Sequence, residues 1–295
     1  MKAILLAAGY GNRLKPLTDV IPKPLLPIVD TCMIDINLGR LLNAGASCVG
    51  INLFHKHEII EHHLKKYDRR VFPVVEDMLK GTGGAFLNFR DFTEDNFIMQ
   101  SADVISDISY EEIFDFHKKH RPIATLVMVR HQGTKFRIDK ENRVDRILGY
   151  DSTPYTYAGI GVFSSRIYSF LPEKPAFTIL EVLRNVFRKN EPILGIPSVM
   201  HWYNINSYYD YWKIHGDLLQ GRTTLDGLKY QSPIYIAPSS RVETEELRGF
   251  VSIADNCRIA KGVCLENTIV LPGTSLSTGR YRNCVISDSL RIAVA

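Results

Sequence analysis

The sequence lacks the features that would place the protein in several large classes. No hydrophobic run approaches membrane-spanning length, and no block of like charge forms an arm for nucleic acid, since the formal net charge is only +4. The five cysteines are odd in number, widely spaced and without a Cys-x-x-Cys pair. They therefore indicate neither a disulfide framework nor a zinc site. These absences predict a cytoplasmic protein that binds neither membrane nor nucleic acid.

What the sequence does contain is most informative at the N-terminus. An apolar strand over residues 3–8 runs directly into Gly9 and Gly11, and Arg13 and Lys23 follow. A Gly-x-Gly turn exposes several backbone N–H groups at one point, and the two side chains add positive charge there. The segment predicts an anion-binding loop.

Two common phosphate loops do not fit this spacing. A dinucleotide-binding fingerprint needs a third glycine where this chain has Leu14, and the Gly-Lys-Ser/Thr of a P-loop is absent. The run Leu-x-x-Gly-x-Gly-x-Arg-Leu-x-Pro-Leu-Thr, followed by Pro-Lys-Pro-Leu-Leu-Pro, instead resembles the sugar-phosphate nucleotidylyltransferases. The resemblance covers about residues 1–220. Residues 157–219 look most like the muramate-1-phosphate uridylyltransferases and mannose-1-phosphate guanylyltransferases, which favours UTP or GTP as the nucleotide.

Short apolar runs alternate with helical patterns along the first part of the chain. Strands are predicted at 3–8, 48–53, 71–75, 96–100, 124–130, 143–148 and 157–163, and helices at 33–43, 56–66, 85–89, 179–188 and 208–219. This alternation predicts an α/β fold with a mostly parallel, open, Rossmann-like sheet. We assign residues 1–222 to this nucleotidyltransferase domain.

The last part of the chain carries a six-residue repeat. Apolar residues recur at Val251, Cys257, Val263 and Ile269, and again at Ile253, Ile259, Leu265 and Leu271, with turn formers between them. The pattern predicts a short left-handed parallel β-helix over residues 230–295, with an ordinary β-meander as the alternative. The open end of such a helix is a sheet edge, which predicts a homo-oligomer formed through it.

The catalytic residues follow from the resemblance and from the chemistry of nucleotidyl transfer. Two negatively charged reactants must meet, so cations and a metal carboxylate are required. Arg13 and Lys23 are the predicted catalytic cations. Asp103, just after the strand at 96–100, is the predicted catalytic ligand of Mg²⁺, with a helix-capping role as the alternative. The resemblance implies that Asn204 is the second metal ligand, although relatives usually carry aspartate there.

The substrate contacts are also implied by the resemblance. The predicted nucleotide-binding residues are Leu6, Ala7, Ala8, Gly9, Gly11, Glu76, Gly81 and Thr82, and the predicted sugar-binding residues are Gly159 and Glu181. Glu181 has solvated helix surface as its alternative. The Glu-Lys-Pro segment typical of the family is absent, because residues 147–151 stand in its place.

Two other patterns do not predict sites. His57 and His62 are five residues apart, whereas two ligands on one helix face would be four apart, so the histidine cluster at 55–63 is interpreted as solvated helix. The aromatic stretch at 202–212 lacks a basic stripe and is interpreted as core.

Together these features predict a Mg²⁺-dependent enzyme that converts a nucleoside triphosphate and a sugar 1-phosphate to a nucleotide sugar and pyrophosphate. The alternative is a catalytically weakened regulatory subunit that binds nucleotide sugars and assembles through its β-helix. The neutral Asn204 and the missing Glu-Lys-Pro segment motivate that alternative.

Overall fold

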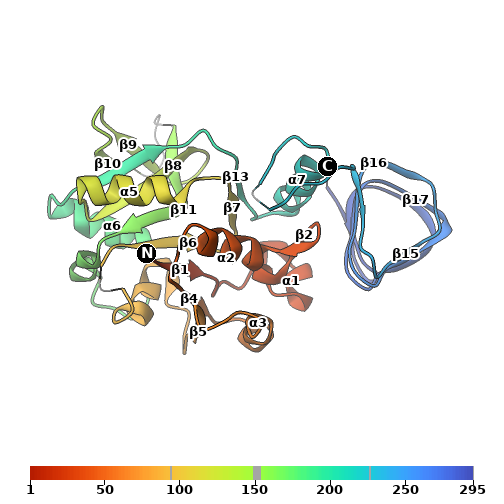
Figure 1. The fold of residues 1–295 in the computed structure, drawn as a ribbon, viewed down its shortest axis with the longest axis horizontal. Helices are drawn as coiled ribbons and strands as arrows, with labels where there is room; N and C mark the ends of the chain where they lie inside the picture. The colour runs from red at the N-terminus through yellow and green to blue at the C-terminus, as the bar shows by residue number, and fades with distance from the viewer. Residues whose placement is uncertain (94, 149–153, 226, 295) are drawn as a thin grey trace. The chain divides into compact units, whose positions relative to one another are not determined.

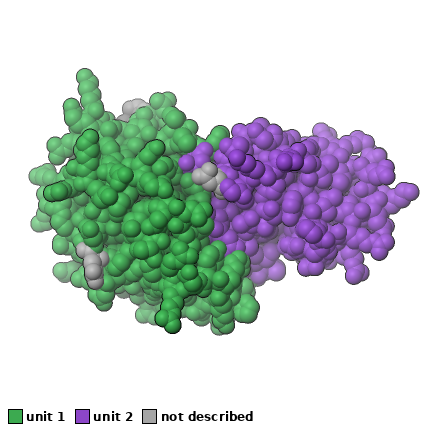
Figure 2. Space-filling model, in the orientation of Figure 1, with its two compact units in different colours: residues 1–10, 37–104, 108–202 green, residues 11–36, 105–107, 203–295 purple. Residues whose placement is uncertain are grey.

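A computed structural model describes residues 1–93, 95–148, 154–225 and 227–294. The chain divides into two compact units, coloured separately in Figure 2. Unit 1 contains residues 1–10, 37–104 and 108–202, and unit 2 contains residues 11–36, 105–107 and 203–295. The phosphate-loop motif is therefore divided between the units after Tyr10.

Unit 1 is built on a nine-stranded mixed sheet (Figure 1). Its strands are β1 (Lys2–Leu6), β4 (Cys48–Leu53), β5 (Val71–Val75), β6 (Phe97–Ser101), β8 (Ala124–Arg130), β9 (Lys135–Ile138), β10 (Val144–Leu148), β11 (Tyr155–Phe163) and β12 (Ile193–Pro197). The order is β10-β9-β11-β6-β1-β4-β5, with β8 between β11 and β12. β1 pairs in parallel with β4 and β6, and β4 with β5. The predicted parallel pairing is confirmed for these central strands.

The remainder of the sheet differs from the prediction. β11 runs antiparallel to β6, β8 and β9, and β9 runs antiparallel to β10. The strands β8 to β11 therefore extend the sheet through antiparallel pairs, and the sheet as a whole is mixed. β12 pairs in parallel with β8 and is an edge strand of the sheet.

Helices cover both faces of this sheet. They are α2 (Met33–Asn43), α3 (His57–Leu64), the single turn α4 (Gly81–Gly84), the 3₁₀ turns η3 (Ala85–Phe89) and η4 (Ser165–Phe170), α5 (Tyr110–His120) and α6 (Ile179–Arg188). The apolar side of α6, which includes Val182 and Val186, packs with Ile4 and Met99 of the sheet. On the other face Asn37 of α2 is hydrogen-bonded to Gln100, the neighbour of Met99 in β6. Because successive side chains in a strand point to opposite faces, α2 and α6 lie on opposite sides.

Unit 2 combines an N-terminal segment with the end of the chain. Its elements include η1 (Asn12–Leu14), α1 (Leu17–Val20), η2 (Lys23–Leu25), β2 (Pro27–Ile28), β3 (Thr31–Cys32) and α7 (Tyr208–Leu219), and most of the strand pair β7 (Val104–Ser106) and β13 (Trp202–Asn204). Tyr211 of α7 is fully buried, and its hydroxyl donates to the carbonyl of Pro27 over 2.7 Å. The ring nitrogen Nε2 of His215 lies 3.1 Å from the same carbonyl. The segment after the phosphate loop is thus packed on α7.

The C-terminal strands of unit 2 stack in parallel. They are β14 (Ile234–Ile236), β15 (Arg241–Val242), β16 (Leu247–Ile253), β17 (Arg258–Val270) and β18 (Ser275–Ile286), followed by β19 (Arg291–Ala293). Ile234 pairs with Val251, Arg241 with Arg258 and Arg258 with Ser275, each 17 residues apart, and other pairs of these strands are 16 or 18 residues apart. Every apolar position of the predicted repeat is buried. An ordinary meander is excluded because its neighbouring strands would be antiparallel.

Most of the predicted elements are found with small shifts at their ends. The predicted nucleotide-binding residues Gly81 and Thr82 lie in the helical turn α4, and the predicted helix at 85–89 is the 3₁₀ turn η3. The helix α5 and the strands β9 and β12 were not predicted. Residues 149–151 of the altered Glu-Lys-Pro segment lie outside the described residues. Among the described residues, no helix is both long enough and apolar enough to span a membrane.

Candidate active site

Gly11 shapes the loop that precedes the two predicted catalytic cations. Its φ is 71°, which an L side chain rarely adopts, and a Cβ there would lie 2.9 Å from Cγ2 of Thr18. The Thr18 hydroxyl donates to the Gly11 carbonyl over 3.0 Å, and the Leu14 amide donates to it over 2.9 Å. The turn is therefore fixed by packing and hydrogen bonds, and it presents Arg13 of η1 as an exposed side chain.

Lys23 and Asn204 are connected within unit 2 by one side chain. Nζ of Lys23 donates to Oδ1 of Asn206 over 3.1 Å, and Nδ2 of Asn206 donates to Oδ1 of Asn204 over 2.5 Å. A predicted catalytic cation and a predicted metal ligand thus lie on either side of Asn206. The connection joins the N-terminal motif to the segment before α7.

Asp210 has a structural role at the start of α7. Its carboxylate accepts from the Asn206 amide over 3.1 Å and from the Ser207 hydroxyl over 2.8 Å, and its own amide donates to Ser207 over 3.1 Å. These bonds form the cap of the helix. The nearest acid downstream of Asn204 therefore orients Asn206.

Glu76 lies at the carboxyl ends of the parallel strands and is 3% exposed. One of its oxygens accepts from Asn52 over 2.9 Å and from Asn88 over 2.8 Å, and the other accepts from the Lys80 amide over 3.1 Å. The carbonyl oxygen of Asn52 accepts from the Ala7 amide over 3.0 Å. This network links β1, β4 and β5 at the edge where an α/β sheet binds ligands.

The network changes what two predicted nucleotide-binding residues can contribute. The Ala7 amide is used by Asn52, and the Leu6 carbonyl accepts from the Ala102 amide over 2.9 Å. Both backbone groups are therefore used in hydrogen bonds within the protein, and they fix the conformation of the loop. Ala8 and Gly9 follow these two hydrogen-bonded residues in the chain. Gly9 is exposed, and a Cβ there would lie in open space.

The glycines of α4 are required by a neighbouring segment of chain. A Cβ on Gly81 would lie 2.7 Å from the carbonyl oxygen of Phe177, and the φ of Gly81 is 78°. The amides of Gly83 and Gly84 both donate to that carbonyl over 3.0 Å, and the Thr82 hydroxyl accepts from the Ile179 amide over 3.1 Å. Close packing on the start of α6 thus accounts for glycine at 81 and 83.

Asp103 and Gly159 are brought close together in unit 1. Asp103 lies in the two-residue turn between β6 and β7 and is half-buried. A Cβ on Gly159 would lie 3.2 Å from both Oγ of Ser101 and Cγ2 of Val104, the residues that flank this turn. The φ of Gly159 is 76°, and the pairing of β11 with β8 is irregular around it. The chain at Gly159 therefore packs closely on the Asp103 turn.

Glu181 forms a capping box at the start of α6. Its carboxylate accepts from the Thr178 amide over 2.8 Å, and Lys174 donates to its other oxygen over 2.5 Å. The hydrogen bond from Lys174 has the larger effect and that from the Thr178 amide the smaller one, and together they lower the pKa of Glu181 to about 2. The carboxylate is thus charged and engaged in capping its own helix.

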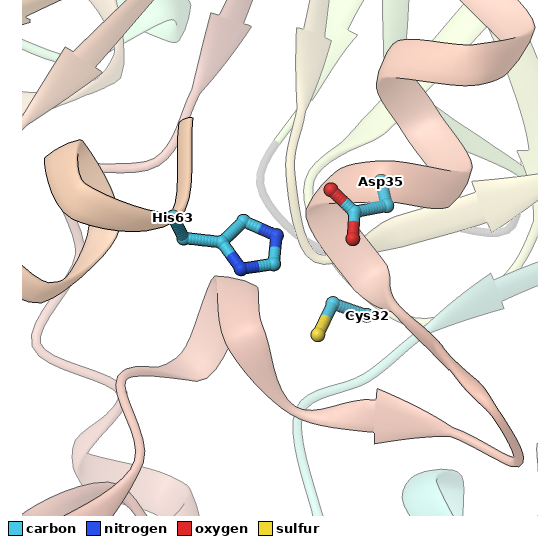
Figure 3. Close-up of side chains that lie close together, drawn as sticks. All are labelled: Cys32, Asp35 and His63. Atoms are coloured by element: carbon cyan, nitrogen blue, oxygen red, sulfur yellow. The ribbon is translucent and has the colours of Figure 1, made fainter. Parts of the chain in front are cut away.

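The histidines predicted to be solvated lie on or next to α3. Nδ1 of His57 is 2.8 Å from Oε2 of Glu61, a partly exposed pair one turn apart. Figure 3 shows His63 of α3 with Cys32 of β3 and Asp35 of α2. Because His63 belongs to unit 1 and the other two residues to unit 2, we assign no metal site to them.

Several residues that organise the site were not predicted from the sequence. Asn52, Asn88 and Asn206 hold Glu76, Lys23 and Asn204 in place. For Asn52 a signal was available, because a polar amide interrupts the apolar strand Cys48–Leu53. Such a residue is buried only when it is hydrogen-bonded. No comparable signal marks Asn206.

Comparison with known proteins decides the family. The family model described as nucleotidyl transferase matches residues 2–221 of the chain. The chain belongs to the nucleotidyl transferase family.

Relatives of this nucleotidyltransferase match almost all of it. It is 26% identical to the mannose-1-phosphate guanylyltransferase of Mycobacterium tuberculosis over 98% of the chain and 80% of that protein. It is 21% identical to the UTP–glucose-1-phosphate uridylyltransferase of a Synechocystis strain over 95% of the chain and 85% of that protein. The crystal structure of UDP-glucose pyrophosphorylase with UDP-glucose has a TM-score of 0.65 at 18% identity, covering 75% of this chain and 99% of that one. The predicted family is confirmed.

Proposed function

We propose that this nucleotidyltransferase combines a nucleoside triphosphate with a sugar 1-phosphate to give a nucleotide sugar and pyrophosphate. The observation that carries the proposal is the connection of Lys23 through Asn206 to Asn204, because it joins a phosphate-binding cation to a metal-binding oxygen within one compact unit. The relatives named above carry out this type of transfer with mannose or glucose 1-phosphate.

The reaction needs positive charge at defined points. A phosphate oxygen of the sugar 1-phosphate attacks the α-phosphorus, and the bond from that phosphorus to the pyrophosphate oxygen breaks. Arg13, exposed beyond the Gly11 turn, binds the leaving pyrophosphate through its planar guanidinium. Lys23 neutralises charge on the α-phosphate or on the attacking sugar phosphate. Positioning and charge neutralisation together supply most of the rate enhancement.

The proposed metal ligands are Asp103 and Asn204. A carboxylate on a two-residue turn and an amide oxygen are hard oxygen donors, which suit Mg²⁺. The ion would neutralise phosphate charge during transfer. Asp103 lies in unit 1 and Asn204 in unit 2, so each is proposed as a ligand from the chemistry of its own oxygen. Asn204 is neutral and binds Mg²⁺ less tightly than a carboxylate would.

The residues that contact the nucleotide and the sugar are also part of the proposal. The loop from Leu6 to Gly11 holds the triphosphate, with Glu76, Gly81 and Thr82 beside the base. Gly159 and Glu181 contact the sugar. UTP or GTP is the proposed nucleotide, in keeping with the names of the relatives.

The C-terminal region is proposed to be a left-handed parallel β-helix over residues 230–295, following the nucleotidyltransferase domain at 1–222. The step of 16 to 18 residues between parallel partners and the buried repeat positions support it. β19 pairs antiparallel with the last part of β18 and covers that edge. Oligomerisation through this region and a cytoplasmic location are parts of the proposal.

The test is a pyrophosphate-release assay of the purified protein with each of four nucleoside triphosphates and a panel of sugar 1-phosphates in the presence of Mg²⁺. We expect release with UTP or GTP and one sugar 1-phosphate, and much slower release in Lys23→Ala. Tight nucleotide binding without release under every combination would support the regulatory alternative, which the names of the relatives do not favour.

A further inference from the structure

A buried network of side chains lies beneath the turn that carries Asp103. Its members are Asn37 and Arg40 of α2, Gln100 of β6 and Tyr110 of α5. Asn37 and Gln100 are fully buried, Tyr110 is 1% exposed and Arg40 is 8% exposed. All four belong to unit 1, as does Asp103.

Two of these side chains bind the backbone on either side of Asp103. Nδ2 of Asn37 donates to the Ala102 carbonyl over 3.0 Å, and Nε2 of Gln100 donates to the Val104 carbonyl over 3.1 Å. The same Nε2 also donates to Oδ1 of Asn37 over 2.7 Å. The peptide group before Asp103, between Ala102 and Asp103, and the peptide group after Val104 are therefore both held by side-chain amides.

The direction of every hydrogen bond in the network is fixed by its two ends. Arg40 can only donate, and it donates to the Tyr110 hydroxyl over 3.4 Å and to the Ile108 carbonyl over 2.8 Å. The Tyr110 hydroxyl in turn donates to Oε1 of Gln100. The chain ends on backbone carbonyls, which can only accept. Neither amide can be reversed without leaving a buried group unpaired.

The turn is held from other directions as well. The Ala102 amide donates to the Leu6 carbonyl at the end of β1, which leads into the phosphate loop. On another side Gly159 approaches Ser101 and Val104 so closely that a Cβ would lie 3.2 Å from each. These contacts hold the backbone of Asp103 in one conformation. A metal ligand requires a fixed orientation of this kind.

We propose that Asn37, Gln100 and Tyr110 are positioning residues, which hold the Asp103 turn in the conformation that binds the divalent cation. The inference rests on the proposed function, since it takes Asp103 as the metal ligand. None of the three touches the substrates in this proposal. They act through the backbone of Ala102 and Val104.

The test compares isosteric variants of the full chain. Asn37→Asp places an acceptor against the Ala102 carbonyl, and Gln100→Glu does the same at Val104. Tyr110→Phe removes one hydroxyl and keeps the ring, so it serves as the milder variant if the other two fail to fold. The matched control is Thr125→Val, which removes the buried hydrogen bond of 2.8 Å between Thr125 and Nδ1 of His117 elsewhere in unit 1.

The readout is binding of Mn²⁺, followed by electron paramagnetic resonance with and without a non-hydrolysable nucleoside triphosphate. We expect Asp103→Asn, Asn37→Asp and Gln100→Glu each to weaken Mn²⁺ binding about tenfold or more, Tyr110→Phe to weaken it less, and Thr125→Val to leave it unchanged. In kinetic assays the metal concentration for half-maximal rate should rise in parallel, with the nucleotide KM little changed.

Two results would overturn the inference. One is wild-type Mn²⁺ affinity in a folded Asn37→Asp, Gln100→Glu or Tyr110→Phe protein, and the other is Mn²⁺ binding that Asp103→Asn does not weaken. Failure of the proposed function would look different. A wild-type protein that forms no nucleotide sugar, yet loses Mn²⁺ binding in Asp103→Asn and in the network variants, would support the positioning role and contradict the proposed reaction.

Discussion

Nζ of Lys23 lies 3.1 Å from Oδ1 of Asn206, although the two residues are 183 positions apart in the sequence. Asn206 also donates to Oδ1 of Asn204, so a single amide orients both a cation and a neutral oxygen of the site. Asn206 thus fixes the position of the Lys23 ammonium group relative to the Asn204 oxygen within unit 2.

Asn204→Asp tests how the neutral amide affects metal binding. A carboxylate binds Mg²⁺ more tightly than an amide, so the Mg²⁺ concentration for half-maximal rate should fall by roughly tenfold. The new carboxylate also accepts from Asn206 as the amide oxygen does now. The measurement is a Mg²⁺ titration of pyrophosphate release.

Asn256→Asp is the control for added charge, because Asn256 is exposed in the turn between β16 and β17. It should leave the Mg²⁺ titration unchanged. An unchanged titration in Asn204→Asp would remove residue 204 from the metal site.

Lys23→Ala should lower kcat/KM by about 100-fold or more, because a charge aimed at the reacting phosphates is lost. Arg13→Ala should have an effect of similar size. Lys15→Ala is the matched control within the same segment, since Lys15 is half exposed and pairs with Asp19 over 3.1 Å. Steady-state kinetics and melting temperatures of the three variants check the prediction. Equal losses in all three would show that the charge of the whole segment matters, and not these two positions.

Glu76→Gln should destabilise unit 1 by about 1–3 kcal/mol. The new amide nitrogen would face donors that now share the carboxylate, namely the Lys80 amide or the side chains of Asn52 and Asn88. Urea unfolding measures the change. Glu61→Gln, whose carboxylate is 37% exposed beside His57, should change stability by less than about 0.5 kcal/mol. Equal effects of the two substitutions would contradict the role of Glu76 as the residue whose hydrogen bonds link β1, β4 and β5.

Burial lowers the pKa of His117 to about 4, and the ring contacts Thr125 and Asn96. An unfolded histidine titrates near 6.5, so the unfolded chain binds the extra proton between these values. The free energy of unfolding should therefore fall as the pH drops from about 6.5 to about 4, and protonation of His117 contributes up to about 3 kcal/mol to that loss. Above about pH 6.5 His117 should not affect the pH dependence of stability.

Ring NMR signals of His117 provide the direct measurement. They should stay those of a neutral imidazole down to about pH 5. In His117→Gln the loss of stability on acidification should be smaller than in the wild type. A ring that gains its proton near pH 6.5 in the folded protein would contradict the prediction.

The elements that the sequence predicted well have strong local signals. The helices 33–43, 179–188 and 208–219 were predicted with the bounds that the structure shows, because each has an apolar face of helical period. The buried positions of the C-terminal repeat were predicted for the same kind of reason. The helix α5 was missed although Ser109 caps it and Glu112 follows at the third position, a pattern typical of helix starts.

The parts that were missed depend on contacts between distant segments. Nothing local shows that β11 joins the sheet antiparallel to β6, or that Phe177 packs on Gly81 and Gly83. The Lys23–Asn206 contact and the network below Asp103 are of the same kind. The residue types of the site could be read from the sequence, whereas the side chains that orient them required the fold.

The composition of unit 2 has a consequence for how the protein is made. Residues 11–36 emerge early during synthesis, but their partners Asn206, Tyr208 and Tyr211 lie 183 to 194 positions later. The partners that fix residues 11–36 are therefore made only with the segment that contains α7. Arg13 and Lys23, the proposed catalytic cations, reach their final places only after that segment has been made, so the contacts that position them form late in folding.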